Sequence, residues 1–401
     1  NNFGSTSVNN TQAGKITLNG GGLQWAVGNT ADISARLNSI GVEGAVFDTN
    51  GNNVLLGTTA LSGIGGITKT GAGNLELNLV NTYTGLTQIN AGNLFVIAGG
   101  SIAASSGVRL SANGTFDVSS GMDQIIKDLS GTGGTVNLGN YSLTVGTSNS
   151  TTYDGLIRDT GGRFIKQGTG VLTLTNANTY SGGTTINGGT LRPANFSGAG
   201  SGSILNNNST LDLAFSNATF NNGIAGTGVN RVTGTNIALA GLNDGFSGIW
   251  RIEGSASVTT PRNLGSGTVV LYSPASKLEL QPVSRAGFNF NNVISGVGTL
   301  SASMGNNIDP FVFGAGSSAS GFTGVVELGQ GTFNLSGKNT EILTEATLRL
   351  SSGNTTTVGN GTQTIGALDI NGGKVAFGVA VPPQTVSPGT INTNYLYISS
   401  N

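Results

Sequence analysis

The chain has 401 residues, 68 of them glycine, with no cysteine, no histidine, 9% charged residues and a formal net charge of −1. The lack of cysteine excludes disulfides and thiolate metal sites, and the lack of histidine removes the commonest general base and metal ligand. A near-neutral chain without a basic block also argues against nucleic acid or an anionic membrane as partner. Since 36% of the residues are hydrophobic and alternate with polar ones, we expect an ordered β protein.

Residues 1–60 open with an asparagine-rich lead, and strand-like alternation begins at residues 16–18 and 22–27. Trp25 lies within an apolar strand, so we expect it to be buried. Residues 31–40 hold the one plausible helical turn of this region, which could equally be an irregular edge.

The first strongly patterned stretch runs from residue 65 to residue 94. Leu75 and Leu77 alternate with polar neighbours, the period-two signature of a strand with one face buried. Glycines permit positive φ at the corners between such strands. Tyr83 stands at one of these corners, and we expect it to cover the edge of the core.

This stretch returns at residues 162–191, shifted by 97 residues without a gap, so that Lys69 corresponds to Lys166 and Tyr83 to Tyr180. Both copies keep glycines, Leu-x-Leu pairs and a polar corner but no catalytic group, which is typical of a building unit. Weaker echoes reach most of the chain. Glycine-to-glycine separations of about 22 residues indicate one turn of a β-helix per echo.

The shared pattern Lys-x-Gly-x-Gly-x-Leu-x-Leu, then Asn-Thr-Tyr-[Thr/Ser]-Gly, then Ile-x-x-Gly-x-Leu resembles the passenger-associated repeat of bacterial autotransporters. The resemblance implies a type V secreted passenger on the bacterial cell surface, exported across the outer membrane. It also implies an all-β fold, a right-handed parallel β-helix. The chain begins without a signal peptide and ends without an anchor, so we expect a processed or excised piece.

We therefore expect a single β-helix over residues 1–401, with N-terminal rungs in 1–60, two full copies in 61–200 and degenerate rungs in 201–401. Loop excursions are expected near 305–320 and 379–388, where prolines and glycines disfavour a regular strand. The residues expected to face the interior are Leu75, Leu77, Ile89, Leu94, Leu172, Leu174, Ile186 and Leu191.

Seven Asn-Gly pairs are the main argument for a different fold, because Asn-Gly is a hairpin signal and hairpins would build an antiparallel sandwich or propeller. The parallel solenoid remains the preferred prediction, because Asn-Gly recurs at a fixed place in the repeat.

No catalytic, cofactor or metal site is predicted, since a serine nucleophile would lack a histidine base. No run of 18 apolar residues could span a membrane as a helix. Three acidic groupings could serve a glycosidase, but isolated surface charges are the preferred interpretation. These groupings are Asp123 with Asp128, Asp154 with Asp159, and Glu341 with Glu345.

Two functions stay open. One is an adhesin that binds a host or neighbouring-cell glycan or protein, or a second copy of itself, with the predicted role in aggregation, biofilm or host-surface binding. The other is a passive stalk or filament that displays another domain. Loops on a rigid scaffold usually supply discrimination between ligands, so the candidate ligand-contact residues are Asp309, Phe311 and Phe313. The alternative for the phenylalanines is that they fold back and cap a rung.

Overall fold

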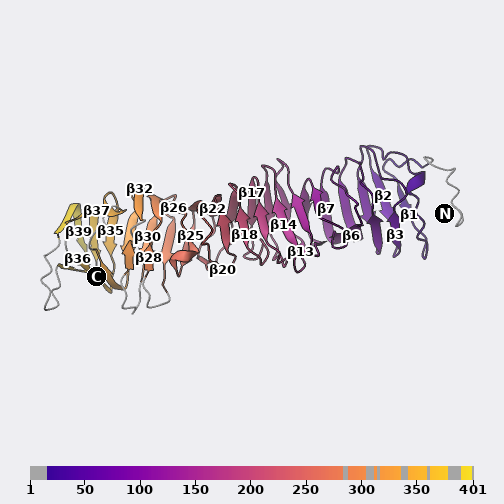
Figure 1. Ribbon diagram of the computed structural model, residues 1–401. Helices are drawn as coiled ribbons and strands as arrows, with labels where there is room; N and C mark the ends of the chain where they lie inside the picture. Colours follow the sequence, from indigo (N-terminus) through magenta and orange to yellow (C-terminus); the bar gives the residue numbers. More distant parts are fainter. Residues whose placement is uncertain are drawn as a thin grey trace. The chain divides into compact units, whose positions relative to one another are not determined.

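The computed structural model describes residues 16–282, 288–303, 311–313, 317–335, 342–358, 362–377 and 390–399. They belong to two compact units, Asn1–Ser209 and Thr210–Asn401. In each unit short strands follow one another in chain order, coloured indigo to magenta in the first and magenta to yellow in the second (Figure 1). No helix among the described residues has the length and apolar character needed to cross a membrane.

The first unit consists of strands of three to ten residues and one short 3-10 turn, η2 (Ser34–Arg36). Its strands are β1 (Gly22–Gln24), β2 (Ala45–Asp48), β3 (Asn53–Leu56), β4 (Ile67–Thr70), β5 (Asn74–Leu77), β6 (Thr87–Val96), β7 (Val108–Asp117), β8 (Gln124–Ile126), β9 (Leu129–Gly131), β10 (Thr135–Asn137), β11 (Ser142–Val145), β12 (Thr151–Tyr153), β13 (Leu156–Arg158), β14 (Arg163–Lys166), β15 (Val171–Leu174), β16 (Thr184–Ile186), β17 (Thr190–Pro193) and β18 (Ile204–Asn206).

Each strand pairing described within this unit is parallel. In the first repeat copy, β4 pairs with β6, with Ile67 opposite Thr87; in the second, β14 pairs with β16, with Ile165 opposite Thr185. Parallel strands cannot be joined by a tight hairpin, so the chain makes one turn between partners. The predicted parallel β-helix is confirmed.

The Asn-Gly signal marks a corner instead of a hairpin. Asn50 and Gly51 have φ of 48° and 83° and join β2 to β3. Those two strands pair with the next turn, β2 with β4 and β3 with β5. The same left-handed backbone that closes a hairpin here turns the chain from one face of the solenoid to the next.

The interior of the first unit holds the residues that the alternation predicts. All eight predicted interior residues are at most 2% exposed. Tyr83 and Tyr180 are also buried, and each hydroxyl lies within hydrogen-bond distance of a threonine, Thr87 at 2.7 Å and Thr184 at 2.6 Å. The corner tyrosines therefore close the edge of the core, as expected.

Trp25 confirms the prediction for the N-terminal rungs. It is 5% exposed, packs 6.2 Å from the Phe47 ring and donates its indole N–H to the carbonyl of Ala31 at 3.0 Å. The helical turn expected within 31–40 is η2.

The second unit is built in the same way, with a short 3-10 turn, η3 (Pro261–Asn263). Its strands are β19 (Thr210–Leu213), β20 (Ala218–Phe220), β21 (Ile224–Gly226), β22 (Val229–Val232), β23 (Ile237–Leu239), β24 (Ile249–Ile252), β25 (Ser255–Val258), β26 (Thr268–Leu271), β27 (Lys277–Leu280), β28 (Phe288–Phe290), β29 (Val293–Gly296), β30 (Thr299–Ala302), β31 (Phe311–Phe313), β32 (Ser318–Phe322), β33 (Val325–Leu328), β34 (Gly331–Asn334), β35 (Thr347–Leu350), β36 (Asn354–Val358), β37 (Thr362–Asn371), β38 (Lys374–Phe377) and β39 (Thr390–Ser399).

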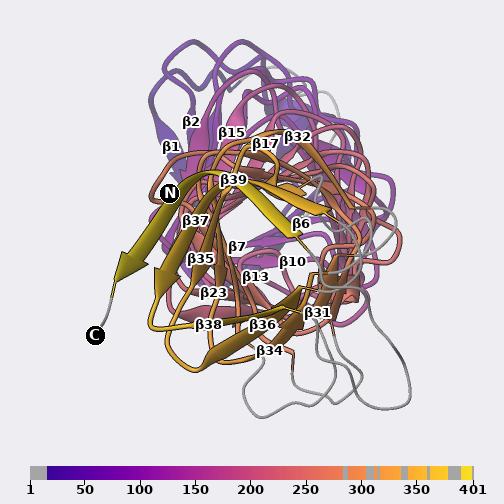
Figure 2. The same cartoon turned by 90° about the vertical axis from the view of Figure 1, so that its left-hand side faces the viewer.

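These strands form parallel ladders on separate faces. One ladder runs from β20 through β23, β25, β27, β30, β33, β35 and β37 to β39, and another joins β28, β31, β34, β36 and β38. Figure 2 shows the ends of both ladders, with β35, β37 and β39 on one side and β34, β36 and β38 on another.

The structure differs from the predicted loop near 305–320, because β31 and the first residues of β32 lie within it. Phe311 stands opposite Phe288 on one side and Phe333 on the other, so β31 continues a ladder. A three-residue strand needs little propensity of its own when both neighbours offer backbone partners. The predicted excursion at 379–388 lies outside the described residues.

Candidate ligand-binding pocket and the repeat corner

The sequence-predicted contact residues do not form one described loop site. Asp309 lies outside the described residues. Phe311 and Phe313 lie in strand β31, where they stand opposite Phe288 and Phe290 of β28. Their place in a ladder weakens the idea of a ligand-binding loop centred on them.

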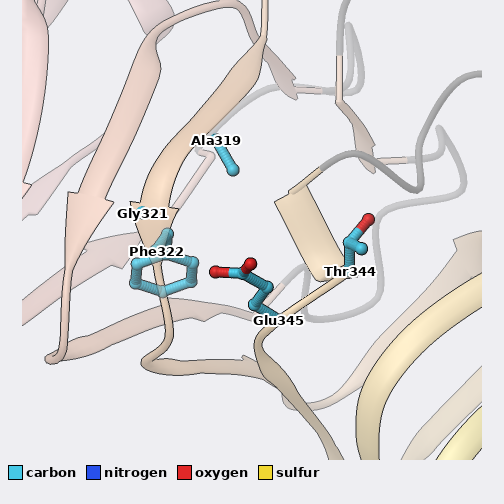
Figure 3. A pocket seen from close by; sticks show the side chains of 5 residues that line it. All are labelled: Ala319, Gly321, Phe322, Thr344 and Glu345. Carbon is cyan, nitrogen blue, oxygen red and sulfur yellow. The ribbon is translucent and has the colours of Figure 1, made fainter.

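A surface pocket of about 320 Å³ does open nearby, lined by Ala319, Gly321, Phe322, Thr344 and Glu345. β32 supplies the first three residues, and the last two lie three and two residues before the start of β35. Figure 3 shows the carboxylate of Glu345 turned toward the ring of Phe322.

The lining of this pocket combines a buried aromatic floor with exposed polar groups. Phe322 is 1% exposed and so belongs to the core, whereas Glu345 and Thr344 are exposed. Within the described part of the chain the Glu345 carboxylate has no hydrogen-bond partner or ion pair. It is therefore free to accept hydrogen bonds from a ligand's hydroxyl, amide or ammonium group.

The other acidic groupings serve the scaffold. Asp123, Asp128, Asp154 and Asp159 each accept a hydrogen bond from an adjacent turn, whereas Glu341 lies outside the described residues. The donors are Ser142 N at 2.8 Å, Thr147 Oγ1 at 2.7 Å, Thr175 Oγ1 at 2.7 Å and Gly139 N at 2.9 Å, respectively. Among the described residues no group of three acidic side chains could hold a metal ion. The carboxylates thus act as structural acceptors between turns and are more than isolated surface charges.

Both repeat copies contain a buried lysine that the sequence reasoning did not predict. Lys69 is 0% exposed, and its ammonium donates to the carbonyls of Thr70 and Gly71 at 2.7 Å each and of Ala91 at 3.1 Å. The first two carbonyls belong to the lysine's own corner and the third to the corner of the next turn. One side chain therefore ties two successive turns together from inside.

Lys166 repeats this arrangement in the second copy. It is 1% exposed and donates to Gln167 O at 2.6 Å, Gly168 O at 3.1 Å and Gly188 O at 3.1 Å. Glycine is needed at these corners, because Gly168 has φ of 68° and a Cβ there would lie 2.3 Å from Thr147 O. The Lys-x-Gly spacing of the repeat is thus explained by one lysine and the carbonyls that it holds.

Burial changes the titration of these groups. It lowers the pKa of Lys69 to about 8, against a smaller raising influence of Asp48. It also lowers the pKa of Lys166, with Asp128 acting in the opposite direction. Both shifts follow from the cost of holding an ammonium away from water.

The asparagine of the repeat's Asn-Thr-Tyr corner also joins turns. Asn81 accepts a hydrogen bond from Leu61 N at 2.9 Å and donates to Ser101 O at 3.2 Å, in the turns before and after its own. Asn178 does the same with Ile157 N and Gly198 O.

The sequence did contain a signal for the burial of the lysines. Residues two apart in a strand lie on the same face, so Lys69 shares its face with buried Ile67.

Comparison with known proteins shows which repeat the chain carries and which proteins it is similar to. The passenger-associated-transport-repeat model matches residues 67–94 and 164–192. The chain is 34% identical over 226 residues to the adhesin BmaC autotransporter of Brucella suis biovar 1 (strain 1330), covering 55% of this chain and 6% of that protein. It is 29% identical over 207 residues to the uncharacterized protein YuaQ of Escherichia coli (strain K12), covering 51% of this chain and 14% of YuaQ.

These matches span only a small fraction of each curated relative's length. A solved structure, the TibC-catalyzed hyper-glycosylated TibA fragment, overlaps 96% of this chain and 99% of its own at 16% identity. Its TM-score is 0.21. Its two passenger-associated transport repeats and its similarity to an autotransporter adhesin indicate sequence of the autotransporter passenger type, with an exported, cell-surface location.

Proposed function

We propose that this passenger is a non-catalytic adhesin, which binds a glycan or protein on a host or neighbouring cell. The observation that carries the proposal is the 34% identity over 226 residues to a protein named as an adhesin. The parallel solenoid adds support, because a rigid stack of turns can hold surface pockets in fixed positions.

A passive stalk is the second candidate. The buried ties of Lys69, Lys166, Asn81 and Asn178 between successive turns favour it, since they stiffen the shaft without creating any binding surface. The two functions differ in whether the isolated chain adheres to anything.

Adhesion of coated beads tests the proposal. Purified chain is coupled to beads, which are incubated with cultured epithelial cells, with a mammalian matrix coating and with each other. An adhesin gives attachment or clumping well above that of albumin-coated beads in at least one of these three arms. Attachment at the albumin level in all three would favour the stalk.

Point variants locate the contact better than a deletion, because removing residues 306–319 would also remove β31 and part of β32. We expect Glu345→Gln to reduce adhesion severalfold if the pocket takes part, and Asp309→Asn to do so if the sequence-predicted contact residue takes part. Glu76→Gln is the matched control, since Glu76 is an accessible carboxylate of the first unit with no hydrogen-bond partner among the described residues. Equal adhesion by all three variants would move the contact away from this region.

A further inference from the structure

A second hollow, which we call the turn groove, crosses three successive turns of the first unit with a volume of about 330 Å³. Its walls include the side chains of Val42, Ile64 and Leu86, which are 67%, 69% and 38% exposed. Because Ala45 of β2 stands opposite Ile67 of β4, Val42 and Ile64 hold the same place in adjacent turns. Val42 and Ile64 therefore form an aliphatic wall across two adjacent turns.

The floor of the turn groove consists largely of glycine, for a structural reason. A Cβ added at Gly65 would lie 1.8 Å from Gly41 O, and one added at Gly66 would lie 2.1 Å from Leu86 O. Close stacking of the corners therefore demands glycine whether or not a ligand binds. Packing does not explain the walls in the same way, since Val42 and Ile64 expose most of their surface to water.

Three polar side chains complete the lining: Glu43, Thr68 and Gln88. Gln88 donates its amide N–H to Asn90 Oδ1 at 2.8 Å. The Gln88 carbonyl oxygen, the Thr68 hydroxyl and the Glu43 carboxylate have no hydrogen-bond partner within the part of the chain that the structure describes. All three are thus available to a ligand, and Glu43 is the one charged residue of the lining.

We propose that the turn groove binds a neutral saccharide of one or two rings, a proposal that rests on the adhesive function and gives it a ligand class. A pyranose offers a C–H face to the aliphatic wall and hydroxyls to the three polar groups. The volume fits a small ligand, near the lower end of the ~300–1,000 Å³ typical of such sites. An acidic sugar would meet the like charge of Glu43, and a purely apolar ligand would leave the polar groups unpaired.

Titration of the purified chain with lactose, cellobiose and N,N′-diacetylchitobiose, followed by NMR, tests this assignment. We expect at least one of these disaccharides to bind, and 3′-sialyllactose to bind about tenfold more weakly than lactose if lactose is the ligand. The double variant Val42→Ser, Ile64→Ser should weaken binding about tenfold, because it removes the apolar wall. Glu43→Gln should restore part of the affinity for sialyllactose.

Val80→Ser is the matched control, since Val80 is 63% exposed in the same unit and does not line the turn groove. Trp25 fluorescence, recorded in a Trp250→Phe background, verifies that the first unit of each variant is folded. Absence of binding by all three neutral disaccharides, or equal affinity of the double variant and the control, would overturn the proposal. The bead assay distinguishes failure of the saccharide site from failure of the adhesin function. If beads coated with the double variant adhere like wild-type beads, the turn groove is not the adhesive site and the adhesin function stands. If wild-type beads do not adhere, the adhesin function itself fails.

Discussion

Replacing Lys69 with methionine should destabilise the first unit by about 2–4 kcal/mol. Methionine fills a similar volume but donates no hydrogen bond, so the carbonyls of Thr70, Gly71 and Ala91 lose the donor that they share. Each unsatisfied buried acceptor costs about 1–3 kcal/mol. Relief from burying an ammonium, the same cost that lowers the pKa of Lys69 to about 8, offsets part of that sum.

The two tryptophans make the assay specific, because Trp25 lies in the first unit and Trp250 in the second. Urea unfolding of Lys69→Met in a Trp250→Phe background is followed by the fluorescence of Trp25. We expect the midpoint to fall by roughly 1 M, given slopes of about 1–3 kcal/mol/M. Lys166→Met should act similarly.

Lys127→Met is the control, since Lys127 is exposed and donates to a single carbonyl, Ala104 O at 2.9 Å. Its effect should stay within about 0.5 kcal/mol. A Lys69→Met chain that unfolds at the wild-type urea concentration would refute the idea that this lysine ties the corners together.

The urea concentration at the unfolding midpoint of the first unit should increase as the pH is raised from about 8 to about 10. In this range folded Lys69 releases its proton, whereas the unfolded chain holds that proton up to the ordinary lysine pKa of 10.5. The same midpoint should decrease above pH 10. Burial raises the pKa of Tyr83 and Tyr180, so these tyrosines lose their protons in the unfolded chain at a lower pH than in the folded chain. A midpoint that declines steadily from pH 8 would contradict this. Tyr83→Phe should lower the free energy of unfolding by about 1 kcal/mol, because it removes the hydrogen bond with Thr87. Tyr153→Phe should leave that free energy unchanged or raise it by up to about 1 kcal/mol, because the buried Tyr153 hydroxyl has no hydrogen-bond partner among the described residues. Equal losses of unfolding free energy for the two variants, measured by urea unfolding, would contradict this difference between the tyrosines. Leu174→Asp should cost more than about 4 kcal/mol or prevent folding, as it places an unpaired charge at a position that is 0% exposed; a wild-type circular dichroism melt would disprove it.

The fold was predictable because its strongest constraint is local. Alternation at Leu75 and Leu77 decides which side chains face inward, and stacking of equivalent turns does the rest. The Asn-Gly pairs misled only in part, since the conformation at Asn50 and Gly51 is that of a tight turn. Whether such a turn closes a hairpin or a solenoid corner depends on distant partners.

The rest could not be predicted because it depends on what lies in the neighbouring turn. A lysine is seldom fully buried, and Lys69 is buried only because the corner carbonyls, including Ala91 of the next turn, surround its ammonium. β31 is a strand because Phe288 and Phe333 flank it, and its own sequence neighbours indicate a loop. The pocket at Glu345 and the turn groove likewise arise from residues more than 20 positions apart.

Adhesion of a folded chain with altered surface sites tests the central claim most directly, namely that the shaft is inert and the hollows bind. The variant combines Val42→Ser, Ile64→Ser and Glu345→Gln. Because all three positions are exposed, the urea unfolding midpoints of the two units, followed by the fluorescence of Trp25 and Trp250, should stay unchanged. Beads coated with this variant should attach to the wild-type chain's target at near the albumin level. Full attachment by the variant, with wild-type midpoints, would show that binding resides in the shaft or elsewhere.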